Sequence, residues 1–180
     1  MCIDGRRRQR GLTLIELVMF IVIVGVALAG VLTVFNVTTK SSADPMIRKQ
    51  MLAIAEALLE EVQLQAFTLC DPDDPAATTA TSAVACATPE AIGPEAGETR
   101  GGATTPFDNV NDYHGLAGIT SSITGVAMPS GYSAAINVAQ DALNGIAAPE
   151  SLRITVTVTR GADSLTLEGY RTRHSPNLLP

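Results

Sequence analysis

Apolar residues are concentrated in one long run near the start of the chain. From Leu12 to Phe35 the sequence is almost wholly apolar, and Glu16 is its single charged side chain. A helix of about 20 residues, rising 1.5 Å per residue, crosses the hydrocarbon core of a membrane. The pattern therefore predicts a membrane-spanning helix over residues 12–36.

A second apolar pattern has helical spacing. Asp44-Pro45 resembles a helix N-cap followed by proline at the first helical position, which predicts a new helix over residues 46–67. Its apolar stripe is wide and not strictly heptad, so we expect an amphipathic helix that covers a sheet rather than a coiled coil. The residues of this stripe are Ile47, Met51, Ile54, Leu58 and Val62.

The remaining chain predicts a globular head over residues 68–180. Residues 71–112 are rich in Ala, Thr, Gly and Pro, which is typical of a surface loop. Residues 131–139 alternate weakly, whereas residues 152–171 alternate cleanly around a central turn and predict a β-hairpin. The expected fold class is α+β: a long N-terminal helix, transmembrane in its first half, packed by its second half on a small antiparallel sheet.

The net charge of -6 is unevenly distributed. Residues 1–11 hold four arginines and one aspartate, and the rest of the chain has eight basic and 17 acidic side chains. Such an acidic body argues against nucleic-acid binding, which normally needs a basic surface. A basic cluster just before an apolar run is typical of a cytoplasmic topology signal.

The three cysteines fall on both sides of the apolar run. Cys2 precedes it, whereas Cys70 and Cys86 follow it. If this part of the chain is exported to an oxidising compartment, Cys70 and Cys86 are expected to form a disulfide; two unrelated buried thiols are the alternative. A zinc site is disfavoured, because no second cysteine pair or histidine cluster accompanies them.

The start of the apolar run has a specific pattern, Arg10-Gly11-Leu12-Thr13-Leu14-Ile15-Glu16-Leu17. A carboxylate inside a membrane-length segment is costly and points to a function. The pattern resembles the class III signal of type IV pilins and pseudopilins, in which a short basic leader ends in glycine and a glutamate stands at a fixed offset within an apolar helix. Leu12 departs from that pattern, because the family usually has phenylalanine or methionine there.

The resemblance implies how the segment is processed and assembled. A prepilin peptidase would remove the leader, residues 1–11, by cutting between Gly11 and Leu12, and the new amine of Leu12 would be N-methylated. Thr13 and Glu16 would serve assembly. The helix would stay in inner-membrane lipid, with the head in the periplasm, until an assembly platform adds the subunit to other major and minor pilins at the cell surface. There Glu16 would pair with a neighbouring subunit's amine and set the axial register.

The head has a weaker resemblance of its own. Residues 107–115 and the C-terminal hairpin resemble minor pilins of the mannose-sensitive haemagglutinin system, its D subunit in particular. This implies a subunit that enters or primes a filament for adhesion or motility. The alternatives are a pseudopilin of a type II-like secretion system and a membrane-anchored exported binding domain that forms no filament. A plain signal peptide, cleaved between Ala29 and Gly30, is also open.

Residues 108–112 contain the main candidate for other chemistry. Oxygen ligands from Asp108, Asn109 and Asp112 could hold calcium. Their spacing is not that of an EF-hand, however, and Asn/Asp clusters are common in turns, so we expect a turn and no metal or cofactor. His114 has no nucleophile elbow or metal motif beside it, so we expect no enzyme activity.

Overall fold

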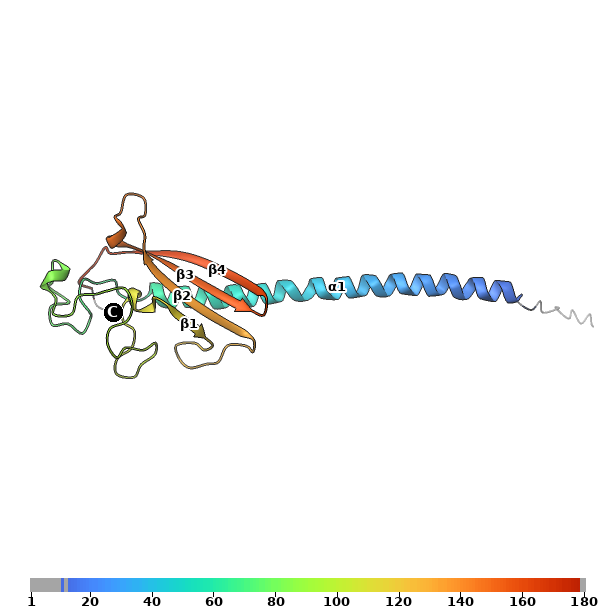
Figure 1. The fold of residues 1–180 in the computed structure, drawn as a ribbon, viewed down its shortest axis with the longest axis horizontal. Helices are drawn as coiled ribbons and strands as arrows, with labels where there is room; N and C mark the ends of the chain where they lie inside the picture. Colours follow the sequence, from blue (N-terminus) through green and yellow to red (C-terminus); the bar gives the residue numbers. More distant parts are fainter. Residues whose placement is uncertain (1–10, 12, 179–180) are drawn as a thin grey trace, which may run out of the picture. The chain divides into compact units, whose positions relative to one another are not determined.

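The computed structural model describes residue 11 and residues 13–178, with the side chains of residues 37–44 excepted (Figure 1). The chain divides into two compact units, residues 1–46 and residues 47–180, which are treated separately below. Helix α1, Leu14–Gln63, contributes to both units. The described residues of the second unit add a four-stranded sheet and three short 3₁₀ helices, in keeping with the α+β fold expected for a pilin-like chain.

The break expected at Asp44-Pro45 is absent, because α1 is continuous and contains Pro45. A proline inside a helix removes one backbone hydrogen bond, and the turns on both sides can sustain the helix. The helix ends at Gln63 rather than at the expected Phe67. Beyond it, Ala66 forms an isolated bridge with Asn109, and the backbone there is no longer helical.

The sheet is antiparallel, with strand order β1-β2-β3-β4. The expected hairpin corresponds to β3 and β4, which pair along their whole length from Ser151↔Thr172 to Arg160↔Asp163. The weakly alternating segment forms β2, and β1 is an additional short edge strand that the sequence pattern did not indicate. The strand bounds are Leu116–Ile119 for β1, Tyr132–Gln140 for β2, Ser151–Arg160 for β3 and Asp163–Thr172 for β4.

The core of the second unit lies between α1 and the sheet. The apolar stripe of α1 faces inward, and the inward residues of β2 and β3 meet it because successive strand residues point to opposite faces. Gly169 of β4 lies close to the helix: a Cβ atom there would stand 2.9 Å from Cδ1 of Leu59. The central core residues are Met51, Ala55, Leu58, Val62, Ile136, Val138, Ile154 and Val156.

The expected surface loop, residues 71–112, is irregular as predicted, apart from the short 3₁₀ helices η1, Ala83–Ala85, and η2, Val110–Tyr113. Its last part is not on the surface, however. Phe107 and Tyr113 are buried in the main core, with their rings edge to face and their centroids 5.1 Å apart. Phe107 within this loop and Tyr113 directly after it thus anchor the end of the loop to the core.

Candidate functional site

Helix α1 begins at a side-chain cap. The Oγ1 atom of Thr13 accepts a hydrogen bond from the backbone N–H of Glu16 at 3.3 Å, and the carbonyl of Thr13 accepts one from Leu17 at 3.1 Å. A threonine followed three residues later by glutamate is the sequence signature of a capping box, so this role of Thr13 could have been recognised from the sequence. The cap fixes the start of the helix and places Glu16 in its first turn.

Glu16 is exposed in the first turn of α1, where the positive end of the helix dipole favours a carboxylate. Gly11 is also exposed, and a Cβ atom built on it would have nothing within 4 Å. The backbone of the predicted cleavage site is therefore open on its Gly11 side. Leu12, whose amine was expected to be methylated, and residues 1–10 of the leader lie outside the described residues.

The segment Leu14–Asn36 is long and apolar enough to span a membrane, and none of it is buried within the structure. Two of its polar side chains bond to the helix itself: Thr33 donates to the carbonyl of Ala29 at 2.9 Å, and Asn36 donates to that of Leu32 at 3.1 Å. Internal hydrogen bonding of this kind is what an apolar environment demands. The segment is thus suited to lie in lipid or against other apolar helices.

Cys70 and Cys86 are joined by a disulfide, as the sequence predicted. The side chain of Asp74 adds a hydrogen bond across the same loop, because its carboxylate accepts from the N–H group of Thr88 at 2.6 Å. The carboxylate also accepts from the N–H group of nearby Ala76 at 2.8 Å. These bonds to the charged form hold the pKa of Asp74 below its ordinary value. The loop from residue 70 to residue 88 is therefore closed covalently and by hydrogen bonds.

The residues proposed as an alternative calcium set build a turn. Asn109 caps η2, and Oδ2 of Asp112 accepts hydrogen bonds from the N–H groups of Asn109, at 2.7 Å, and Asp108, at 3.0 Å. Burial raises the pKa of Asp112 to about 8, although these two N–H groups act in the opposite direction. His114 follows the turn, and its Nδ1 lies 2.5 Å from the carbonyl oxygen of Val138.

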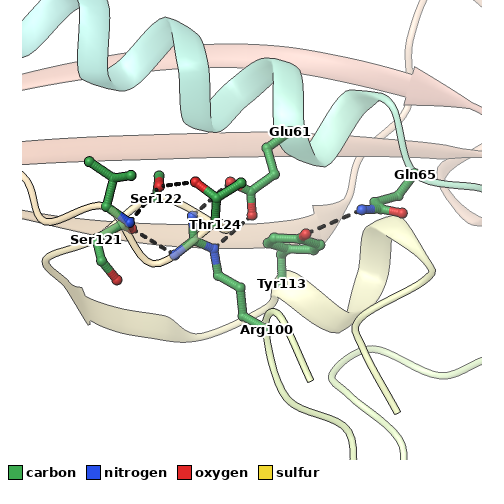
Figure 2. A network of polar contacts seen from close by, with 8 residues as sticks. Glu61, Gln65, Arg100, Tyr113, Ser121, Ser122 and Thr124 are labelled. Carbon is green, nitrogen blue, oxygen red and sulfur yellow. Dashed lines mark hydrogen bonds and ion pairs between the residues drawn. The ribbon is translucent and has the colours of Figure 1, made fainter. Parts of the chain in front are cut away.

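A polar contact that the sequence did not indicate connects the loop to α1 (Figure 2). The guanidinium group of Arg100 forms a bidentate ion pair with Glu61, and it also donates to the carbonyl of Ser121 at 2.9 Å. Nearby, Gln65 donates to the hydroxyl of Tyr113 at 3.3 Å. Burial, and secondarily the negative charge of Glu61, raises the pKa of Tyr113 above its ordinary value.

Comparison with known proteins connects the N-terminal segment to a described motif. Residues 6–32 match the model of the prokaryotic N-terminal methylation motif. No curated protein and no solved structure matches the chain, so the resemblance of the head to one particular minor pilin gains no support. The matched residues include Gly11, Thr13 and Glu16 and most of the exposed apolar helix. The chain thus carries a prepilin-type N-terminal motif, which supports a type IV pilin-like or pseudopilin-like protein.

Proposed function

We propose that this chain is a minor type IV pilin, a structural subunit that enters or primes a filament serving adhesion or motility. The observation that carries the proposal is the overlap of the methylation motif at residues 6–32 with an unburied, membrane-length helix. The same helix continues into α1 residues that form one side of the head's core. A helix with one end in lipid and the other in a folded head suits a subunit that leaves the membrane to join a filament.

Processing is the first step of the proposed function. Prepilin peptidase would cut between Gly11 and Leu12, on the cytoplasmic side of the inner membrane, and the amine of Leu12 would be methylated. Exposure of Gly11, together with the open space around its Cα, is compatible with access by a protease. The head would then lie in the periplasm, an oxidising compartment that suits the Cys70–Cys86 disulfide.

Assembly is the second step. An inner-membrane platform would draw the subunit out of the lipid and pack its apolar helix against those of other major and minor pilins. Glu16 would then lose water and lipid headgroups, and the amine of a neighbouring subunit's Leu12 would compensate its charge. Because an unpaired buried charge is strongly unfavourable, such a pair selects one axial offset between subunits. Repetition of one head-to-tail contact that does not close generates a helical filament.

A pseudopilin of a type II-like secretion system is the second candidate, because the N-terminal motif is shared by both groups. It differs in the filament that it joins and not in the chemistry of its N-terminus. A membrane-anchored binding domain that forms no filament is the third. It predicts that the chain remains in the membrane fraction whatever stands at position 16.

Filament entry tests the proposal. Cells that express the full chain, or its Glu16→Gln variant, would be sheared, and the released filaments would be probed for the chain. The wild-type chain is expected in the filament fraction, and Glu16→Gln is expected to be processed yet largely absent from it. Glu56→Gln, an equal charge change on the exposed side of α1 in the head, is the matched control and should enter normally. Normal entry of Glu16→Gln would contradict the register argument.

A further inference from the structure

Three carboxylates from separate positions in the chain converge beside η2. Glu90 and Glu95 come from the irregular loop, and Asp112 comes from η2 itself. One oxygen from each lies within 4.8 Å of the others. Glu90 and Glu95 are half-buried, and Asp112 is only 1% exposed. In their ionised forms, three carboxylates gathered in so small a volume and partly removed from water would repel one another, and a cation between them would relieve this repulsion.

Among the residues that the structure describes, no ion pair joins a basic side chain to this cluster, and Arg173 acts on Glu90 only as a charge at longer range. The ion pairs among the described residues join Arg100 to Glu61, Arg153 to Asp141 and Glu168, and Arg173 to Glu150. None of them includes a member of the cluster. A second group of acids, Asp71, Glu98 and Asp108, belongs to the same loop region and adds to the negative potential. Such a potential attracts cations.

An unsatisfied oxygen points independently to a missing ligand. Oδ2 of Asp112 accepts hydrogen bonds from two backbone N–H groups, but Oδ1 is buried and has no hydrogen-bond partner outside the cluster, where the side chain of Asp112 interacts with that of Glu95. A buried acceptor without a partner is costly and requires an explanation. The carboxylate of Glu90 is held in place by the side-chain amides of Asn109, at 2.9 Å, and Asn111. Ligand oxygens fixed by neighbouring amides are typical of a metal site.

We propose that Glu90, Glu95 and Asp112 form a calcium-binding site. The donors are all carboxylate oxygens, which a hard divalent cation prefers. Calcium binds oxygen at about 2.3–2.6 Å, so ligands on opposite sides of the ion stand about 4.6–5.2 Å apart. The three oxygens lie within 4.8 Å of one another, so one calcium ion can contact all of them. Magnesium demands near-ideal octahedral geometry and gives up its water reluctantly, so it suits an irregular set of carboxylates less well.

The proposed ion would fasten the loop to the core of the head. The side-chain amide of Asn109 donates a hydrogen bond to Glu90 and another, of 2.6 Å, to the hydroxyl of Thr68 just beyond α1. Calcium would add Glu95 and the unsatisfied oxygen of Asp112 to this network. With three protein carboxylates, the remaining coordination would come from water. Sites of this kind on extracellular modules bind calcium with Kd values of about 10⁻⁴ to 10⁻³ M.

Calcium titration of the full chain tests the proposal. The chain would be purified in a neutral detergent, stripped with EDTA, exchanged into chelator-free buffer and titrated with calcium chloride in a calorimeter. One site in the range given above is expected. Glu95→Gln should weaken binding at least tenfold, because it removes a half-exposed ligand without disturbing the cap of η2. Glu56→Gln is the control of equal charge change and should bind as the wild type does. Magnesium at the same concentration should not compete.

A second variant and a second measurement distinguish the loss of a calcium ligand from misfolding of the variant. Glu90→Gln should weaken calcium binding as Glu95→Gln does, and calcium should raise the Tm of the wild-type chain more than that of either variant. Circular dichroism would establish that each variant is folded. Absence of bound calcium in the wild-type chain at 10 mM would overturn the proposal. So would unchanged binding in folded Glu95→Gln, or binding that is lost only on Glu98→Gln, which would place the ion in the other acidic group.

Discussion

The guanidinium group of Arg100 donates two hydrogen bonds of 2.7 Å to the carboxylate of Glu61, and this pair fastens the irregular loop to α1 (Figure 2). The two side chains are only 10% and 12% exposed. In this environment the pair is shielded from water and salt far more than a surface ion pair. It therefore fixes the path of residues that belong to neither a helix nor a strand.

Replacement of Arg100 by Met should lower the free energy of unfolding of the head substantially. Removing one partner of a buried pair leaves the other charge without compensation and costs about 3–5 kcal/mol; the slight exposure here favours the lower end. Urea denaturation of the full chain in detergent, followed by circular dichroism, measures the change. Glu60→Gln, on the exposed side of α1, is the control and should change little. A loss below about 1 kcal/mol would mean that the pair behaves as a surface pair.

A side chain at position 169 should destabilise the head. A Cβ atom at this position would lie 2.5 Å from Nε2 of Gln63 and 2.9 Å from Cδ1 of Leu59, so the helix and the sheet would have to separate or both side chains would have to move. Because both neighbouring atoms are the ends of flexible side chains, Gly169→Ala is expected to cost about 1–3 kcal/mol, as overpacking typically does. Gly169→Val should cost more. Equal stability of the alanine variant and the wild type, in the same urea experiment, would contradict this packing.

Reduction of the Cys70–Cys86 disulfide should destabilise the head. The two residues are 16 apart, and closing a loop of this length stabilises a chain by about 3 kcal/mol in the chain-entropy model. A Cys70→Ala/Cys86→Ala double variant should therefore unfold at a lower urea concentration than the oxidised wild type. Alkylation followed by intact mass analysis verifies the pairing, since neither cysteine should react without reductant. Reaction of both thiols in the unreduced, folded chain would show that the bond is absent.

Asp74 should make the stability of the same loop depend on acid pH. Its pKa is lowered from 3.8 by hydrogen bonds from the backbone of Thr88 and then of Ala76. A carboxyl group with a lowered folded-state pKa contributes its full stability above the unfolded value and loses it as the pH falls through the folded value. Asp74→Asn should thus lower the Tm at neutral pH, and the difference from the wild type should disappear well below pH 4. A difference that persists in acid would show that the charge is not responsible.

Local periodicity accounts for most of what the sequence could predict. The apolar stripe of α1 and the alternating residues of β3 and β4 are patterns within short windows, and the structure has both elements. Strand β1 gave no such signal, because it has four residues, only Ile119 is buried, and Gly118 has a φ of 69°. The helix boundary predicted at Pro45 was wrong, because a long helix can continue past a proline that removes one hydrogen bond.

Contacts between distant residues account for what the sequence could not predict. The ion pair of Glu61 and Arg100 joins residues 39 apart through an irregular loop, and no local rule specifies such a path. The convergence of Glu90, Glu95 and Asp112 depends on the same loop. Sequence reasoning identified Asp112 as a member of a turn but not its acidic neighbours. By contrast, Gly11, Thr13 and Glu16 lie in a contiguous N-terminal motif that can be read from the sequence, and the motif match at residues 6–32 covers them.

Identification of the first residue of the mature chain tests the account most directly. The chain would be isolated from membranes of cells that contain prepilin peptidase, and its N-terminus determined by mass spectrometry. Leu12 should be the first residue and should carry a methylated amine, and Gly11→Val should leave the leader attached. A mature chain that begins at Gly30, or one that retains Met1 in the presence of active peptidase, would contradict the proposed processing and with it the assignment as a pilin subunit.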